Sequence, residues 1–254
     1  VEPVSNRLML MPVGNRHHDA IKLMNTIRAV YFDAVGTLIH PKPAAPVIYA
    51  EAAGRFGSQY SLEIITRRFS RALLEQDEID RARGWITSAP RERERWRSIV
   101  AAVLDDVADP AGCFDFLYSH FAGALSWRCE PGAEALFENL LARGYQLGLA
   151  SNFDERLHAL VPGLKPLQYL AKNIVVSFEV GFRKPAPEFF KAMCRRMGLE
   201  AGHILHVGDE PENDCAGAMA VGMQAVLIDP RGRHSTWPEA RIASLGELKN
   251  YESL

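Results

Sequence analysis

The pattern of apolar and polar positions divides the chain into segments of different periodicity. Residues 27–32 form an apolar run that stops at Asp33 and a Gly-Thr turn, which is typical of a buried parallel strand. Between residues 43 and 128, apolar residues recur at spacings of three and four, and no strand-like alternation interrupts them. We therefore predict a helical insert of roughly four helices over residues 43–128.

Beyond residue 129, short apolar runs alternate with helical patterns. Strands are predicted at residues 145–150, 173–177, 203–207 and 224–228, with helices at 133–142, 185–197 and 213–221. Such alternation is typical of right-handed βαβ units. The predicted fold class is α/β, with a doubly wound parallel sheet formed by residues 27–42 and 129–254. Residues 1–26 show no clear periodicity and are expected to form a loosely ordered N-terminal arm.

Composition narrows the functional classes. The 254 residues are 48% hydrophobic and 24% charged, which is ordinary for a globular protein. A formal net charge of -2 gives no reason to expect nucleic acid or an acidic membrane surface as a partner. No apolar run approaches the ~20 residues that span a bilayer. The four cysteines have no metal-finger spacing and indicate reduced thiols, so we expect a cytoplasmic protein.

Polar residues follow four segments of the predicted sheet: Asp33, Ser151-Asn152, Lys184, and Asp209 with Asp214. Because the carboxyl ends of parallel strands lie at one edge of a sheet, these groups can converge on one crevice. A carboxylate can act as a nucleophile, while hydroxyl, amide and lysine groups can hold phosphoryl oxygens. Paired acids can bind Mg²⁺. Each of these short stretches alone is about as easily explained by an ordinary turn or helix cap as by a functional role. All four in this order favour phosphoryl-transfer chemistry.

These motifs resemble those of the haloacid dehalogenase-like (HAD) hydrolase superfamily, in particular its members with a helical cap between the first two motifs. The residues that carry the resemblance are Asp33-Ala34-Val35-Gly36-Thr37-Leu38, Leu149-Ala150-Ser151-Asn152, Arg183-Lys184-Pro185-Ala186-Pro187, and His206-Val207-Gly208-Asp209 with Glu212-Asn213-Asp214. They are spread over residues 27–230. The stretch Ser151-Asn152-Phe153-Asp154 is most similar to the Dreg-2-like group.

The resemblance implies a Rossmann-like core with residues 43–128 as its cap, and a hydrolase that acts on a small phosphorylated molecule, an ester or an anhydride. It also implies site roles, in which Asp33 is the nucleophile and Thr37, Ser151, Asn152 and Lys184 complete the catalytic set. Ser151, Asn152 and Lys184 would bind the phosphoryl group. Mg²⁺ would be held by Asp33, the backbone carbonyl of Val35 and Asp209, with Asp214 supporting the metal or its waters.

Val35 departs from the pattern. Typical phosphatases of the family have a second Asp at this position, which protonates the leaving alcohol. Valine cannot transfer a proton, and general acid catalysis contributes roughly 10²–10⁴ in rate. We therefore expect slow hydrolysis of ordinary sugar phosphates.

Three functions remain compatible with the sequence. The favoured one is a metal-dependent phosphatase that is restricted to good leaving groups or borrows an acid such as His40. A haloacid dehalogenase needs no acid for its leaving group, but Asp209 suits a cation better than an anionic haloacid. A catalytically weak member could instead act as a binding protein through its cap. A phosphonatase-like Schiff base ranks last, because residues 43–130 contain no lysine.

Other charged residues are assigned structural roles. The run Arg91-Glu92-Arg93-Glu94-Arg95 is interpreted as a solvated helix face with alternating charges. Solvated faces are also expected for the arginines at 55, 67, 68 and 71. Core or surface roles are expected for His120, His158, His203 and His206.

Overall fold

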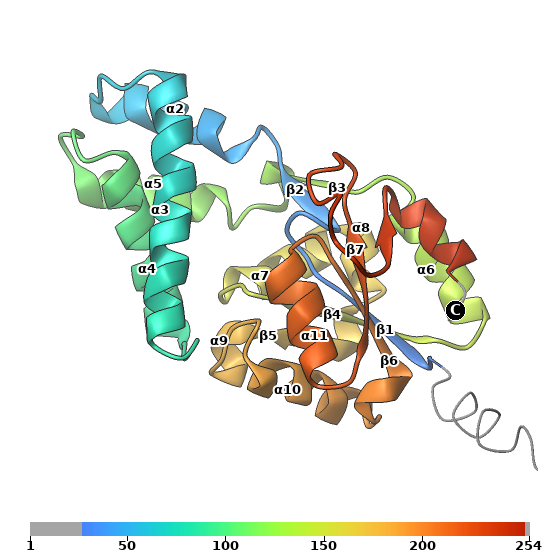
Figure 1. The fold of residues 1–254 in the computed structure, drawn as a ribbon. Coiled ribbons are helices and arrows are strands. Elements are labelled where there is room, and N and C mark those ends of the chain that lie inside the picture. The colour runs from blue at the N-terminus through green and yellow to red at the C-terminus, as the bar shows by residue number, and fades with distance from the viewer. Residues whose placement is uncertain (1–26, 252–254) are drawn as a thin grey trace, which may run out of the picture.

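The computed structural model describes residues 27–251, and the predicted arm over residues 1–26 lies outside this range. The described chain forms a parallel sheet flanked by helices, together with a group of helices that stands beside it (Figure 1). No helix in the described part is long and apolar enough to cross a membrane.

The six strands of the sheet are all parallel and lie in the order β5-β4-β1-β6-β7-β8. They are β1 (Ala29–Phe32), β4 (Gln146–Ser151), β5 (Ile174–Val176), β6 (Ile204–Gly208), β7 (Gln224–Ile228) and β8 (Arg241–Ile242). The chain winds outward from β1 through β4 to β5, and then returns to the other side of β1 with β6. The predicted doubly wound α/β fold is therefore confirmed. The two-residue β8 was not predicted, because it is too short to have a recognisable period.

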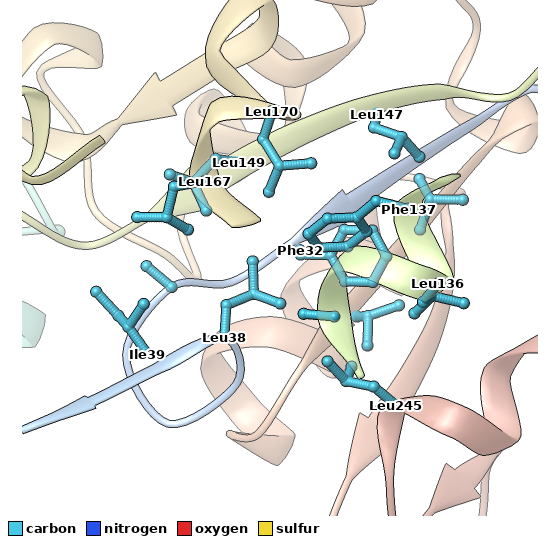
Figure 2. Close-up of a cluster of buried hydrophobic side chains, with 14 of the residues drawn as sticks. Phe32, Leu38, Ile39, Leu136, Phe137, Leu147, Leu149, Leu167, Leu170 and Leu245 are labelled. Carbon is cyan, nitrogen blue, oxygen red and sulfur yellow. The ribbon is translucent and has the colours of Figure 1, made fainter. Parts of the chain in front are cut away.

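Strand β1 is buried on both faces, which explains why its sequence is apolar throughout. Val30 and Phe32 belong to one hydrophobic cluster, whereas Ala29 and Tyr31 belong to a second cluster on the opposite face. Figure 2 shows the first cluster, in which the rings of Phe32 and Phe137 lie 5.0 Å apart. Alternate residues of one strand thus join both layers of helices to the sheet.

Helices cover both faces of the sheet. On the side of Phe32 lie α6 (Ala133–Ala142), α7 (Arg156–Leu160) and α8 (Lys165–Gln168). On the side of Tyr31 lie α10 (Pro187–Met197) and α11 (Gly217–Ala220), and α9 (Ser177–Val180) follows β5. Short 3₁₀ turns occupy Ala124–Ser126, Val161–Gly163, Ala171–Asn173, Ala201–His203 and Leu245–Asn250.

The helix predicted at residues 213–221 is wrong in its detail. The chain forms a π-helical turn over Pro211–Ala216, and only Gly217–Ala220 is α-helical. The carboxylate of Asp214 accepts a hydrogen bond from the backbone N–H of Glu210 (3.1 Å), and it is buried against the end of β6. Local sequence propensity does not reveal this contact with the strand end.

Four helices lie within the segment for which helical periodicity was found: α2 (Ala45–Phe56), α3 (Leu62–Ala82), α4 (Ala89–Val103) and α5 (Pro110–His120). We call these four helices the helical insert. They bury their own hydrophobic cluster, separate from the two clusters of the sheet. The side chains of Ser61, Ser88 and Asp109 accept backbone N–H bonds at the starts of α3, α4 and α5.

An antiparallel pair of short strands connects the helical insert to the sheet. The two strands are β2 (Ile39–Pro41) and β3 (Trp127–Cys129), which precede and follow the four helices. Both ends of the insert pass through this one ribbon, which follows the carboxyl end of β1. The insert therefore stands beside the edge of the sheet at which the strands end (Figure 1).

Candidate active site

The sequence motifs meet at the carboxyl edge of the sheet, where the strand order reverses. Asp33 follows β1, Asp209 follows β6, and Ser151 is the last residue of β4. Since β6 returns beside β1, the position between Asp33 and Asp209 is the topological switch point at which open α/β sheets bind ligands. Ser151, Lys184 and the two acids line one cavity of about 550 Å³.

Lys184 lies at the centre of this group of side chains. Its Nζ donates to Oδ1 of Asp33 (2.6 Å), Oδ1 of Asp214 (2.5 Å) and the carbonyl of Ala150 (3.1 Å). The amide of Asn152 accepts from the backbone N–H of Lys184 (2.7 Å) and donates to its carbonyl (3.0 Å). Asn152 therefore positions the lysine through its main chain. The side chain of Ser151 is buried and lines the same cavity.

Three carboxylates form a compact cluster of oxygen atoms. Asp33, Asp209 and Asp214 each place one oxygen within 4.8 Å of the others. Two glycines allow this approach. A Cβ on Gly36, whose φ is +99°, would lie 2.3 Å from Oδ2 of Asp209, and a Cβ on Gly208 would lie 2.1 Å from Cγ of Asp214. Thr37 donates to Oδ1 of Asp209 (3.3 Å), so its hydroxyl orients that carboxylate.

The acids differ in their electrostatic environment. Burial raises the pKa of Asp33 above its ordinary value, although Lys184 opposes this shift. Burial and the neighbouring carboxylate of Asp33 also raise the pKa of Asp209. Burial disfavours ionised Asp214 too, but Lys184 and His206 hold the pKa of Asp214 well below its usual range. The Nε2 of His206 lies 2.9 Å from Oδ1 of Asp214.

This cluster fits a divalent cation. Its ligands are hard oxygens, the class that Mg²⁺ prefers, and three carboxylates face a single ammonium group. Burial is the main cause of the raised pKa values of Asp33 and Asp209, and the neighbouring carboxylates raise them further; a bound cation would favour the ionised form of both acids. Val35, whose carbonyl was expected to be a further ligand, lines the same cavity and is 38% exposed.

A second charged cluster joins the helical insert to the core. Glu92 of α4 accepts from Nη1 of Arg183 at 2.6 and 2.5 Å, and also from Thr87 (2.9 Å) and Ser177 (3.1 Å). Backbone bonds from Thr87 to Gly181 (2.9 Å) and from Arg183 to Trp85 (2.9 Å) flank this ion pair. The contact therefore fixes the insert to the residue that precedes Lys184.

The interpretation of residues 91–95 as a solvated helix face holds for Arg93 and Glu94 but is wrong for the other three residues. Glu92 and Arg95 are buried, and Arg91 is mostly covered. Arg91 and Arg95 both pair with Asp80 of α3, at 2.6 and 2.9 Å. The alternating charges looked solvated because their partners, Asp80 and Arg183, come from other segments of the chain. Arg68 also differs from a solvated residue, since its guanidinium donates to the carbonyls of residues 102 and 103 at the end of α4.

Two histidines bear on the predictions. His40 pairs with Glu130 (2.8 Å) and is not among the residues that line the cavity. His206 is fully buried, in keeping with the core or surface role expected for it, and it also contacts Asp214 beside the acidic cluster, which was not predicted. Its position in β6, three residues before Asp209, was the available signal, since Asp209 follows the end of that strand.

Sequence reasoning missed a group of apolar side chains that line the same cavity as Asp33. The helical insert contributes Tyr49, Phe69, Leu73 and Trp96, and the core contributes Trp127 and Phe153. In the sequence, Phe69, Leu73 and Trp96 are part of apolar helical stripes, which indicate packing between helices. Only the position of the insert over the sheet edge shows that they also line a cavity.

The fold and this arrangement of motifs are those of a hydrolase family. The family model for haloacid dehalogenase-like hydrolases matches residues 27–222, and the chain belongs to this family. It is an enzyme of the hydrolase class, as the sequence motifs predicted.

Similar proteins agree with this assignment. The human haloacid dehalogenase-like hydrolase domain-containing protein 3 is 28% identical over 233 residues, which cover 87% of this chain and 92% of the relative. The rhythmically expressed gene 2 (Dreg-2) protein of Drosophila melanogaster is 24% identical over 222 residues, 82% of this chain and 85% of that protein. The crystal structure of a HAD phosphatase from Thermococcus onnurineus is similar with a TM-score of 0.64 and 25% identity, covering 88% and 97% of the two chains. The predicted similarity to the Dreg-2-like group is confirmed.

Proposed function

We propose that this protein is a Mg²⁺-dependent phosphatase that uses Asp33 as its nucleophile and acts on small phosphate monoesters or anhydrides with good leaving groups. The observation that carries this proposal is the position of Asp33. Its carboxylate contacts the ammonium of Lys184 (2.6 Å) and shares an oxygen cluster with Asp209 and Asp214 at the switch point of the sheet. In this proposal the nucleophile therefore lies next to both the lysine that binds the phosphoryl group and the acids that bind the metal.

The chemistry follows from these positions. An oxygen of Asp33 attacks the phosphorus atom, and the bond from phosphorus to the leaving oxygen breaks with its electron pair on that oxygen. Water then hydrolyses the acyl phosphate, which releases phosphate and restores the carboxylate. Lys184 and the hydroxyl of Ser151 hold the phosphoryl oxygens, and Asn152 keeps Lys184 in place. Asp33, the carbonyl of Val35 and Asp209 would hold Mg²⁺ with support from Asp214, and the bound ion would supply positive charge that neutralises the phosphoryl group.

The leaving group receives no proton from position 35. Val35 lines the cavity but has no ionisable group, and His40, the proposed substitute acid, is engaged with Glu130 and does not line the cavity. Leaving groups that are stable as anions, such as phenolates and carboxylates, therefore suit the site. Hydrolysis of alkyl phosphates would lack the rate acceleration of roughly 10²–10⁴ that a general acid contributes.

The acidic cluster favours this function over dehalogenation. A 2-haloacid must place its own carboxylate beside the nucleophile, where Asp209 and Asp214 add negative charge. A metal-bound phosphate ester is compatible with the same acids, because the cation compensates for their charge.

The first test is hydrolysis of acetyl phosphate, phenyl phosphate and an alkyl phosphate with and without Mg²⁺. We expect turnover of the first two that requires Mg²⁺ and is lost in Asp33→Asn. Val35→Asp should increase turnover of the alkyl phosphate. Activity that persists in Asp33→Asn, or halide release from 2-haloacids without metal, would contradict the proposal.

Metal binding can be measured without turnover. We expect Mg²⁺ to raise the melting temperature of the wild type and to have a much smaller effect on Asp209→Asn. Asp115→Asn is a suitable control, because Asp115 lies on α5 of the helical insert, is exposed and does not line the cavity. An equal response of all three proteins would count against the acidic cluster as the binding site.

A further inference from the structure

The part of the cavity that faces away from the sheet is apolar and largely aromatic. Its lining includes Tyr49, Phe69, Leu73 and Trp96 of the helical insert together with Trp127 and Phe153, and Asp33 lines the same cavity. Tyr49 and Phe69 are in edge contact with ring centroids 4.9 Å apart, and those of Trp127 and Phe153 lie 6.1 Å apart. We call these six side chains the aromatic chamber. The cavity of about 550 Å³ falls within the range of small-molecule sites.

Every cation that lines the cavity among residues 27–251 already has a carboxylate partner. Lys184 pairs with Asp33 and Asp214, and Arg183 pairs with Glu92. The remaining two cations are also paired: Arg95 with Asp80 at 2.9 Å, and Arg156 with Asp154 at 2.6 Å. A second anionic group on a substrate would thus enter the chamber without an available counterion, and burying an unpaired charge is costly.

Uncharged polar groups are also scarce in the cavity. Among the residues described, the uncharged hydrogen-bonding side chains of the lining outside the motifs around Asp33 are those of Tyr49, Ser70, Trp96 and Trp127, and the indole N–H of Trp127 already donates to the carbonyl of Phe121 (3.1 Å). A sugar would bury several hydroxyl groups that each need a hydrogen-bond partner. The chamber is therefore poorly matched to sugar phosphates and well matched to a flat apolar group.

The absence of a general acid at position 35 also favours a substrate with an aromatic leaving group. A phenol, such as the side chain of tyrosine, has a pKa near ~10, whereas water has a pKa near ~15.7. A phenolate therefore leaves more easily than an alkoxide when no acid protonates it. The apolar, largely aromatic lining of the chamber and the missing acid are independent observations, and both favour an aromatic leaving group.

We propose that the aromatic chamber binds the leaving group of the substrate, and that the substrate is an aryl phosphate monoester without a second acidic group. This inference rests on the proposed phosphatase function and adds the class of substrate to it. In the reaction, Asp33 takes the phosphoryl group, the ester oxygen leaves as a phenolate, and water releases phosphate from Asp33.

Two substrates separate the effect of the chamber from the effect of leaving-group chemistry. The carboxylate of 4-carboxyphenyl phosphate withdraws electrons, so its phenolate is the better leaving group, but it carries a second charge. With the full chain and Mg²⁺, we expect kcat/KM for 2-naphthyl phosphate to exceed that for 4-carboxyphenyl phosphate by about tenfold or more, the discrimination typical of an apolar pocket. Equal values, or a preference for the carboxylated ester, would overturn the inference.

Variants test whether the chamber causes this preference. Phe69→Ala removes one ring of the wall, and we expect it to reduce the ratio of kcat/KM for 2-naphthyl phosphate over phenyl phosphate. Phe116→Ala removes a ring of the same insert that does not line the cavity, and it should leave that ratio unchanged. An unchanged ratio in Phe69→Ala, or an equal change in both variants, would contradict the proposal.

A binding measurement distinguishes failure of this inference from failure of the proposed function. Calorimetry with Asp33→Asn and Mg²⁺ gives dissociation constants for 2-naphthyl phosphate and 4-carboxyphenyl phosphate without turnover. We expect the naphthyl ester to bind at least about tenfold more tightly. If the wild type hydrolyses acetyl phosphate but the two esters bind equally, the substrate class is wrong and the phosphatase function stands. If no ester or anhydride is hydrolysed, the phosphatase function fails, and with it this inference.

Discussion

Glu92 offers a sharp test of how the helical insert is held on the core. Its side chain is 1% exposed and accepts hydrogen bonds from Arg183, Thr87 and Ser177. In Glu92→Ala the guanidinium of Arg183 remains buried without its carboxylate. The Nε of Arg183 has no hydrogen-bond partner among the described residues, and the other carboxylate near it, Oδ2 of Asp80 at 3.6 Å, already accepts a hydrogen bond from Arg95.

The expected magnitude follows from burial. Removing one partner of a buried ion pair costs about 3–5 kcal/mol, because the other charge remains desolvated. Glu94 is the matched control, since it lies on the same helix and pairs with Arg97 (3.0 Å), with both side chains more than half exposed. Exposed pairs contribute about 0.2–1 kcal/mol, so Glu94→Ala should change the free energy of unfolding little.

Urea denaturation followed by tryptophan fluorescence measures the two free energies of unfolding. The insert can also move away from the core and expose Arg183 to water, which would limit the loss of stability. In that case hydrogen exchange should be faster at the amides of Thr87 and Arg183, which bond to Gly181 and Trp85 across the contact. If Glu92→Ala changes neither stability nor exchange beyond Glu94→Ala, the ion pair does not hold the insert.

Three further predictions concern the site and the core. Gly36→Ala should abolish most of the rise in melting temperature that Mg²⁺ produces, because the new Cβ would lie 2.3 Å from Oδ2 of Asp209 and displace it. Lys184→Met should lower kcat for acetyl phosphate by about 10² or more, since it removes the ammonium beside the nucleophile; a loss below tenfold would contradict its role. Phe137→Ala should reduce the free energy of unfolding in urea by about 3–5 kcal/mol, because its ring is fully buried against Phe32.

The sequence alone determined the fold class and the family. Strands that are buried on both faces must be apolar throughout, so β1 and β6 are visible as short runs, and βαβ alternation implies a parallel sheet. Asp33, Ser151-Asn152 and Asp209 lie at or directly after the ends of such runs, whereas α9 and a loop separate Lys184 from β5. Because parallel strands end at one edge, the order of the motifs predicted that Asp33 and Asp209 would meet, and the structure places their oxygens within 4.8 Å.

The tertiary structure decided which side chains are paired and which surround the substrate. Asn152 binds the backbone of Lys184 across 32 positions of sequence, and Glu92 meets Arg183 across 91. The periodicity of a helix shows that one face is apolar, but it does not show what covers that face. The chamber exists only because the insert packs over the sheet edge, and burial of this kind depends on contacts between distant segments that no local pattern encodes.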